Sequence, residues 1–599
     1  MTGLTEQGWI GSEILFGALS EKCSEYGFWE ITMDYSDCLR KFDDRCAQAG
    51  EEQEKLLLKI LAREKDTVWG KKYDFAGIRS VEAYQRKVPF SVFEDYEPLI
   101  ERQLAGEAGL VNAKEPFMYC ISSGSTGDEK YIPVSPEDAR KQQAYWEGVI
   151  PGTIAQALSG YRTEELFGDL FQDADVYETF GANGKRTGVR SGVGPRYAKL
   201  SGSFPFSDYY APPEVLFPEK LEEMLYVKLR FALADRNITA LHSNFIHKLV
   251  SLFSYIERHL TEFAEDVATG QVSSFFSVTE EWQAYLKAHL APDPARGEEL
   301  KALADAGKKE GLIRRIWPNL KYARTISGEL FRPYLEQYRV YAGDLPLHSF
   351  VYASSETNLG IADCLDGKGE YCLLPDVCFY EFLPESGTTG DPEPTGKAEP
   401  AGGTEPARER GTTALTVKDV KVGGRYELIV TTLNGFYRYR LGDVVEVVGF
   451  RGACPKIRVC YRENLVLSVA DEKLNVSQLE MAMTGFLEAC GAHANGYCVT
   501  GDYTGDAPRY RVFVEADKAL SADAAVILDR FLREMSFGYR SSRSLQEIDL
   551  PVICPLRSGC FRSLEKESVR EGRRPEQLKP LRVLRSKKEE EFLERWIEQ

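Results

Sequence analysis

A β-meander pattern in the second half of the chain most strongly restricts the folds open to it. Two β-rich segments, 426–431 and 436–440, flank an Asn-Gly dipeptide that is typical of hairpin turns. A third segment, 444–448, is almost entirely valine and follows a Gly-Asp pair. We therefore predict a meander of antiparallel strands, with Asp443 at a corner between two of them.

The rest of the 599-residue chain mixes helical and strand patterns. Helical periodicity dominates residues 50–105, whereas strands are predicted on both sides of a tight loop at 122–127. From residue 465 onward, short helices and strands alternate. The fold class is therefore predicted to be mixed α/β, with a small α+β domain from about residue 465.

One segment of the predicted large domain has no means of forming a core. Residues 384–412 contain no aromatic, Ile, Leu, Val or Met residue, and 11 of these 29 residues are Gly or Pro. Such a segment buries too little apolar area to offset the entropy of ordering it. We predict a flexible surface insertion between two strands.

Charge and hydropathy exclude two classes of partner. The chain has 92 acidic and 74 basic residues, which give a net charge of -18. Because binding along a nucleic acid needs dense Lys and Arg, no nucleic-acid partner is expected. No window approaches the about 18 to 20 consecutive apolar residues of a membrane span, and the start of the chain lacks the pattern of a signal peptide. We expect a cytoplasmic protein with no membrane partner.

The 13 cysteines are scattered and include no Cys-x-x-Cys pair. Neither a disulfide framework nor a zinc knuckle is indicated by this spacing. Buried, reduced thiols are the expected state of these cysteines.

The first candidate functional segment is a loop of small residues followed by Lys130. Backbone N–H groups and hydroxyls in such a loop can form a phosphate cradle, to which a lysine adds a positive charge. The spacing does not fit a Walker motif, and an isolated Ser/Gly turn is the alternative. The loop residues are Ser122, Ser123, Gly124, Ser125, Thr126 and Gly127.

Two further segments carry chemistry. Tyr352, Ser354, Ser355 and Glu356 supply a stacking face, hydroxyls and a hard oxygen ligand suited to Mg²⁺, although Ser355 could instead be a helix N-cap. Asp443 could accept hydrogen bonds from two ribose hydroxyls, or could be a turn aspartate that binds nearby amides. The alternating arginines before Asp443 are more typical of a solvated strand face than of a phosphate clamp.

In order and spacing, these segments resemble the ATP-binding motifs of the acyl-adenylating superfamily. Their details resemble the auxin-responsive promoter family of acyl acid amido synthetases. The resemblance rests on Ile121-Ser-Ser-Gly-Ser-Thr-Gly127, Tyr352-Ala-Ser-Ser-Glu356-Thr-Asn-Leu-Gly360 and Tyr437-Arg-Tyr-Arg-Leu-Gly-Asp443, with further similarity at 316–321, 430–432 and 577–579. It covers roughly residues 50 to 585. Plant members usually show Ser-Ser-Gly-Thr-Ser-x-Gly in the first loop, whereas Ser125 and Thr126 are inverted here and one residue is missing before Lys130. With these departures the chain resembles a divergent, bacterial member of the family.

The resemblance implies a luciferase-like adenylate-forming fold, in which a large N-terminal domain, residues 1–464, with β-barrel and α/β parts carries a small mobile C-terminal domain, residues 465–599. It implies that Mg²⁺-ATP converts a small-molecule carboxylic acid to an acyl-adenylate with release of pyrophosphate, and that an amino-acid amine then attacks the acyl carbonyl. A hinge is expected near 462–468.

The resemblance also implies roles for individual residues. Lys130, Lys579 and Glu356 are the expected catalytic residues, of which Glu356 holds Mg²⁺. The phosphate-binding donors would be Ser123, Ser125, Thr126 and Lys130, because negative charge builds around the α-phosphate. Tyr352 would stack on adenine, and Asp443, helped by Arg462, would bind the ribose hydroxyls.

Two alternatives remain at this point. An acyl-CoA or other thioester ligase would form the same adenylate and pass the acyl group to a thiol. A nonenzymatic nucleotide-binding homologue would retain the fold alone, although such a protein has no need of the Mg²⁺ ligand Glu356.

Overall fold

The computed structural model describes most of the chain. The described residues are 34–123, 129–172, 179–180, 184–205, 208–218, 224–328, 331–385, 414–462, 466–467, 469, 474–502, 508–536, 539–540, 543, 548–570, 581–584 and 587–598. Helices and sheets are both abundant, and they confirm the mixed α/β class. Within these residues no helix is both long enough and apolar enough to cross a membrane.

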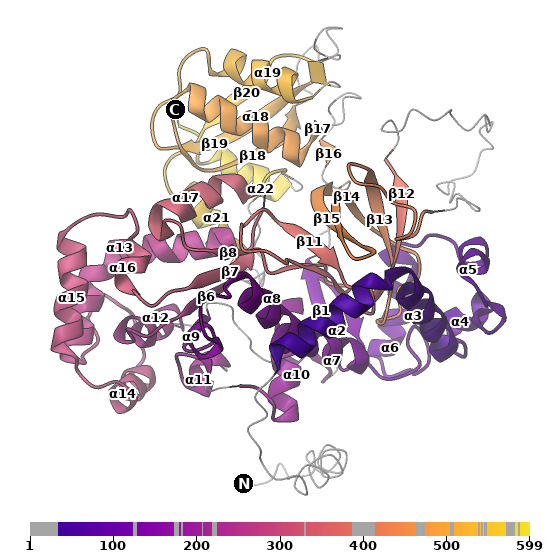
Figure 1. The fold of residues 1–599 in the computed structure, drawn as a ribbon. Coiled ribbons are helices and arrows are strands. Elements are labelled where there is room, and N and C mark those ends of the chain that lie inside the picture. The colour runs from indigo at the N-terminus through magenta and orange to yellow at the C-terminus, as the bar shows by residue number, and fades with distance from the viewer. Residues whose placement is uncertain are drawn as a thin grey trace, which may run out of the picture.

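A four-stranded parallel sheet lies at the centre of the large N-terminal part (Figure 1). Its strands, in the order β3-β6-β7-β8, are β3 (Leu170–Gln172), β6 (Ala240–Phe245), β7 (Tyr322–Ile326) and β8 (Leu347–His348). The helices around it include α12 (Met224–Ala234), α13 (Ile246–Thr269), α15 (Pro294–Asp305) and α17 (Arg332–Ala342). One apolar cluster joins these helices to the sheet. Parallel strands need such helical cover because both of their faces are buried.

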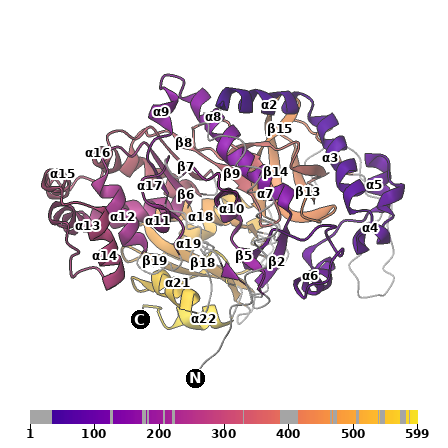
Figure 2. The same ribbon diagram turned by 90° about the horizontal axis from the view of Figure 1, so that it is seen from below.

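A seven-stranded antiparallel sheet forms the other side of this part. The views in Figures 1 and 2 agree in placing it opposite the helices α12 to α17. Its order is β12-β13-β14-β15-β11-β10-β9, and the strands are β9 (Val351–Ala353), β10 (Asn358–Ile361), β11 (Glu370–Leu373), β12 (Cys378–Pro384), β13 (Arg425–Thr432), β14 (Tyr439–Arg451) and β15 (Cys454–Arg462). Its apolar cluster also holds α2 (Tyr35–Ala47) and α3 (Ala49–Glu64). This sheet is the counterpart of the predicted β-barrel part.

The first strand of the predicted meander is present as β13, but the segments predicted at 436–440 and 444–448 do not form two strands, and the corner at Asp443 is wrong. Asp443 lies inside β14, which runs without interruption from Tyr439 to Arg451. The ladder pairs Ile429 with Arg440 and Glu427 with Val444, so residues 441–443 bulge opposite a single residue of β13. Gly442 has a φ of 72°, which a glycine adopts without strain. The Gly-Asp pair therefore bends a strand that continues, rather than ending it.

The predicted insertion falls between two neighbouring strands. Strands β12 and β13 pair antiparallel from Cys378 opposite Thr432 to Pro384 opposite Tyr426. Residues 386–413, which include most of the predicted insertion at 384–412, lie outside the described residues. The flexibility of this segment stays a prediction.

The predicted strands around the small-residue loop form a hairpin. Strand β1 (Met118–Ser123) pairs antiparallel with β2 (Glu129–Val134), in a sheet of order β2-β1-β5-β4 with β5 (Arg186–Gly188) and β4 (Thr179–Phe180). The next helix, α7 (Pro136–Ala144), begins as predicted after Ser135, whose hydroxyl accepts a hydrogen bond from the Asp138 backbone N–H at 3.1 Å.

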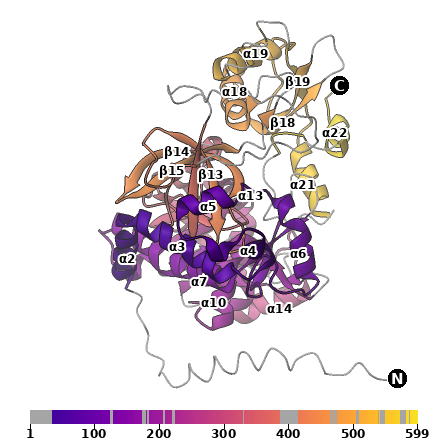
Figure 3. The same cartoon turned by 90° about the vertical axis from the view of Figure 1, so that its right-hand side faces the viewer.

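The C-terminal part has hydrophobic cores of its own. It contains α18 (Val476–Ala489), β18 (Ala494–Asp502), β19 (Arg509–Ala516), α19 (Ala524–Met535), β20 (Val552–Pro555), α21 (Cys560–Arg570) and α22 (Lys587–Glu594). This alternation of helices and strands was predicted from the sequence. Figure 3 shows the part standing above the antiparallel sheet and the N-terminal helices.

Candidate active site

The predicted phosphate loop connects β1 to β2. Ser122 and Ser123 end β1, and Ser122 lies opposite Lys130 in the ladder. Gly124, Ser125, Thr126 and Gly127 lie outside the described residues, as do the side chains of Ser122 and Ser123. The hairpin therefore brings Lys130 back beside the residues that open the loop.

The Tyr352 and Asp443 side chains meet directly. Tyr352 Oη donates a hydrogen bond of 2.7 Å to Asp443 Oδ2. Only 8% of Tyr352 and 3% of Asp443 are exposed. Tyr352 comes from β9 and Asp443 from the bulge in β14, so the antiparallel sheet joins two motifs that are 91 residues apart. The pair fixes the orientation of the carboxylate.

The turn after β9 carries the serines and Glu356. Ser354 donates its backbone N–H to the Thr357 carbonyl at 3.0 Å, and the chain enters β10 at Asn358. No helix begins here, so the alternative of Ser355 as a helix N-cap is wrong. Ser354 is buried, whereas Ser355 and Glu356 are partly exposed.

Glu356 is held from two sides. Tyr439 Oη donates to Glu356 Oε1 at 3.0 Å, and Asn434 Nδ2 donates to the Glu356 backbone carbonyl at 2.8 Å. Burial, followed by the negative charge of Glu356, raises the pKa of Tyr439 well above its usual value. Tyr439 therefore stays protonated and remains a hydrogen-bond donor to Glu356.

Lys130 reaches the same region through Glu94. Lys130 Nζ lies 3.2 Å from Glu94 Oε1 and 4.6 Å from the centre of the Phe93 ring. The negative charge of Glu94 also contributes to the raised pKa of Tyr439, after burial and Glu356. The backbone just before Phe93 and Glu94 is held along the start of β14. The Ser91 carbonyl accepts a hydrogen bond of 2.9 Å from the Arg440 backbone N–H, and the Ser91 backbone N–H donates to the Arg438 carbonyl at 3.0 Å.

The two arginines before Asp443 have different environments. Arg440 is 44% exposed in its side chain and pairs with Glu427, which agrees with a solvated strand face. Arg438 is 2% exposed and pairs with the buried Glu381 at 3.0 Å, so the prediction of a solvated position is wrong for Arg438. An arginine that packs inside the sheet needs a charged partner there, and Glu381 on β12 supplies it.

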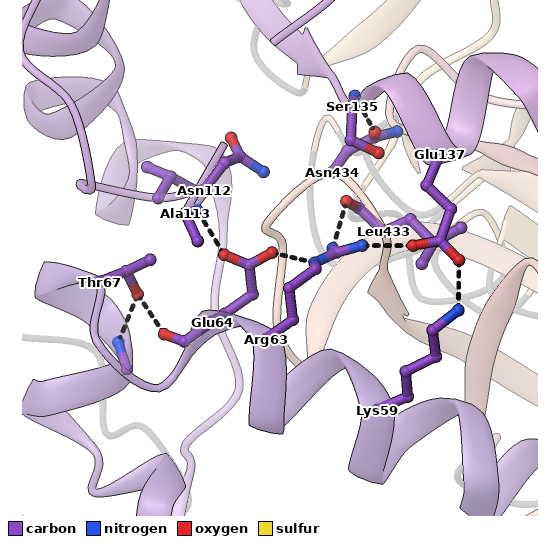
Figure 4. Close-up of polar contacts among 12 residues, drawn as sticks. Lys59, Arg63, Glu64, Thr67, Asn112, Ala113, Ser135, Glu137, Leu433 and Asn434 are labelled. Atoms are coloured by element: carbon purple, nitrogen blue, oxygen red, sulfur yellow. Dashed lines mark hydrogen bonds and ion pairs between the residues drawn. The ribbon is translucent and has the colours of Figure 1, made fainter. Parts of the chain in front are cut away.

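A polar network holds the β13–β14 turn in place (Figure 4). The Ser135 backbone N–H donates to Asn434 Oδ1 at 2.7 Å, at the N-terminus of α7. Arg63 on α3 donates to the Leu433 carbonyl at 2.9 Å and to Glu137 at 2.7 Å. Helix α3 is thereby joined to the turn at Leu433 and the start of α7 at Asn434, which in turn binds Glu356.

A buried basic group lies where β6 and β7 pair. Arg324 is 5% exposed, and its guanidinium lies over the rings of Trp146 at 5.3 Å and Phe350 at 5.5 Å. His242 lies opposite Arg324 in the ladder. Burial, followed by the charge of Arg324, lowers the pKa of His242 well below its usual value, so this imidazole is neutral. Among the described residues no carboxylate pairs with Arg324.

Of the predicted site residues Arg462 and Lys579, the structure describes only the backbone of Arg462. The backbone of Arg462 ends β15 and pairs with Asp443 in the ladder, but its side chain is not described. Lys579 and most of the predicted hinge at 462–468 lie outside the described residues. The roles of both side chains stay predictions.

Sequence reasoning missed Asn434, Tyr439 and Glu94. Asn434 was interpreted only as a turn signal, and Tyr439 was quoted within a motif without a role. The Asn-Gly signal does place Asn434 in a turn, but its bonds to Ser135 and Glu356 join segments 299 and 78 residues away. No local pattern predicts such contacts.

Comparison with solved structures identifies the fold. The structure of the GH3.15 acyl acid amido synthetase superposes with a TM-score of 0.79 and 22% sequence identity, over 96% of this chain and 98% of that chain. The fold is therefore that of the acyl acid amido synthetases.

Sequence matches identify the family. The GH3 family N-terminal domain matches residues 38–347, the central domain 371–462 and the C-terminal domain 477–588. The chain belongs to the GH3 family. Its relatives include the indole-3-acetic acid-amido synthetase GH3.2 of Arabidopsis thaliana, 28% identical over 72% of this chain and 77% of that protein. A probable indole-3-acetic acid-amido synthetase, GH3.1 of Oryza sativa subsp. japonica, is 26% identical over 92% of this chain and 90% of that protein.

Proposed function

We propose that this protein is an ATP-dependent acyl acid amido synthetase. In the first step a carboxylate oxygen attacks the α-phosphorus of ATP. The bond between this phosphorus and the oxygen that bridges to the β-phosphate breaks, and pyrophosphate leaves. In the second step an amino-acid nitrogen attacks the acyl carbon, loses a proton, and AMP leaves. The observation that best supports this proposal is the buried Tyr352–Asp443 pair beside the Tyr439–Glu356 pair, built on the fold of a GH3 family member.

The proposed roles of the ATP-binding residues follow from their chemistry. Asp443 would accept the ribose hydroxyls, assisted by Arg462, and Tyr352 would orient Asp443 and contact adenine. Lys130 would exchange its surface partner Glu94 for a phosphate oxygen. Lys579 would approach from the C-terminal part. Donors aimed at the α-phosphate before reaction lower the barrier, because they need no rearrangement as negative charge develops.

Glu356 fits the requirements of a Mg²⁺ ligand. Mg²⁺ prefers oxygen ligands and is usually held by one or two carboxylates together with substrate phosphates. The Glu356 carboxylate is partly exposed, and Tyr439 binds only its Oε1 in the described part of the structure. The second oxygen can therefore face a cation. Bound there, Mg²⁺ would neutralise negative charge on the phosphates of ATP.

Asn434 acts as a positioning residue in this proposal. We expect Asn434→Ala to raise the Mg²⁺ concentration needed for half-maximal rate by about tenfold, because residues behind a metal ligand typically contribute 10- to 100-fold to metal affinity or activity. Ser135→Ala is the matched control, since it removes a helix cap but keeps the backbone N–H that binds Asn434. A Mg²⁺ dependence that is equal in both variants would show that Asn434 only stabilises the turn.

The acid is proposed to lie at the parallel sheet. Ligands of parallel sheets bind near the carboxyl ends of the strands. Trp146 and Phe350 provide aromatic walls there, and Arg324 provides a buried positive charge that no carboxylate of the described protein neutralises.

Domain movement is part of the same proposal. We place the boundary between the domains near residues 464 and 465, with the insertion at 384–412 on the surface of the large domain. Rotation of the C-terminal domain about 462–468 would change the site between the two steps and exclude water that would hydrolyse the adenylate. Because the reaction consumes ATP and a free amino acid, a cytoplasmic location belongs to this proposal.

Acid-dependent exchange of labelled pyrophosphate into ATP tests the first step. We expect exchange with at least one member of a library of carboxylic acids and none without acid. Amino acids and coenzyme A are then offered separately to the preformed adenylate. Amide formation is expected; turnover with thiols alone would favour the thioester ligase, and no exchange with any acid would leave only a nucleotide-binding protein.

A further inference from the structure

Three cysteines from distant parts of the chain meet in the core of the N-terminal part. Cys46 lies in the last turn of α2, Cys372 in β11, and Cys454 begins β15. Their sulfur atoms all lie within 4.8 Å of one another, and Cys46 Sγ and Cys372 Sγ are 3.8 Å apart. At most 1% of each residue is exposed, and all three are free thiols. We call these three residues the cysteine triad.

The spacing of the sulfur atoms matches the coordination shell of a thiophilic cation. Thiolate sulfurs about 2.3 Å from a tetrahedral Zn²⁺ lie about 3.8 Å from one another, and three sulfurs around Cu⁺ have a similar spacing. The Leu373 carbonyl oxygen is 3.2 Å from Cys454 Sγ and 3.6 Å from Cys372 Sγ, so an oxygen donor adjoins the sulfurs. We propose that the cysteine triad binds one closed-shell thiophilic cation, Zn²⁺ or Cu⁺, as a structural metal site.

The charge around the triad is compatible with bound metal. Three thiolates on Zn²⁺ carry one net negative charge, which is costly to bury without a positive neighbour. Arg451 lies opposite Cys454 in the backbone ladder at the end of the β14–β15 hairpin. Its guanidinium lies 5.3 Å from the centre of the Phe42 ring, and Phe42 lies one helical turn before Cys46. Arg451 also binds Asp43 at 2.7 Å, which orients the guanidinium. A guanidinium, which also lies 3.7 Å from Asp363, is thus fixed beside the site.

A metal at this position would connect three elements. It would tie α2 to β11 and β15, and the loop closed between Cys46 and Cys372 spans 326 residues. Because no such site exists in the unfolded chain, the free energy of metal binding would add to the stability of the fold. This role is separate from the proposed active site, and its test does not depend on activity.

Metal analysis of the full-length protein tests the proposal. The protein is purified under reducing conditions and dialysed, and its bound metal is measured by elemental mass spectrometry. Parallel samples are reconstituted with Zn²⁺ alone and with Cu⁺ alone. We expect about one equivalent of metal per chain, as for a single structural site. Whichever sample retains its cation through dialysis identifies the metal. We also expect strong chelators to lower the thermal-unfolding midpoint.

Variants separate a metal site from buried thiols that only fill space. Cys372→Ala is expected to lose at least nine-tenths of the bound metal. Cys378→Ala is the matched control, because Cys378 is equally buried in the same core cluster but belongs to no such group in the described structure, and it should retain the metal. If the wild-type protein retains neither cation after reconstitution, the proposal is wrong. That measurement uses no variant, so a variant that fails to fold leaves the test intact.

Discussion

Replacing Asp443 with alanine is expected to reduce acid-dependent pyrophosphate exchange by on the order of a hundredfold or more, because one prepositioned polar contact in an active site is typically worth about 3 to 4 kcal/mol. The variant also removes the buried hydrogen bond between Tyr352 and Asp443. Lys130→Ala removes the proposed phosphate contact and should lower the rate to a similar degree. The measurement is the initial rate of exchange at saturating ATP and acid.

Tyr352→Phe provides the control for Asp443→Ala. It removes the 2.7 Å hydrogen bond but keeps both the ring and the carboxylate, so we expect a smaller loss of rate than in Asp443→Ala. Circular dichroism establishes that each variant is folded. Near-normal exchange in folded Asp443→Ala would remove this residue from the mechanism, and the same outcome for Lys130→Ala would remove the lysine.

Replacing Arg438 with methionine is expected to lower the free energy of unfolding by about 3 to 5 kcal/mol, the usual cost of leaving one member of a buried ion pair alone. Arg438 Nε lies 3.1 Å from both carboxylate oxygens of Glu381. Its Nη1 donates to the backbone carbonyls of Gln85 at 2.7 Å and Val88 at 2.9 Å, and its guanidinium lies 4.1 Å from the Phe90 ring. The substitution therefore strands a carboxylate and two carbonyls inside the protein. Urea unfolding measures the effect.

Arg440→Met is the matched control for Arg438→Met. Arg440 is only two residues away, but its side chain is 44% exposed, and exposed pairs typically contribute about 1 kcal/mol or less. We therefore expect a clear difference between the two variants. The double variant Arg438→Met/Glu381→Met should recover part of the loss, because it removes the stranded carboxylate. Equal unfolding midpoints for Arg438→Met and Arg440→Met would refute the importance of burial here.

The fold was predictable where local patterns decide it. Helix α7 follows a Ser-Pro start signal, and the hairpin of β1 and β2 follows two short apolar runs. The continuation of β14 through Gly442 was not predictable, because a Gly-Asp pair suits both a corner and a bulge. The choice depends on β13, which pairs on both sides of the bulge and keeps the strand in the sheet.

In the candidate site, too, local patterns predicted some features, whereas others depend on contacts between distant segments. Motifs predicted Tyr352, Glu356 and Asp443 as residues of one site, and the structure joins Tyr352 to Asp443 directly. The burial of Arg438 depends on Glu381, which lies 57 residues earlier in the sequence. The cysteine triad was likewise invisible to spacing rules, since its members come from a helix and two strands far apart in the chain. Such features arise only when distant segments pack together.

The pairing of Asp443 with Arg462 at the end of β15 has a mechanical consequence. This rung is the last in the β14–β15 ladder before the chain leaves for the C-terminal part. If the connecting segment turns at the proposed hinge, the backbone that carries the proposed ribose ligand would lie at the base of that movement. Rotation about the proposed hinge would then act on the strand pairing that positions the Asp443 backbone. Nucleotide affinity would then change with the orientation of the C-terminal domain.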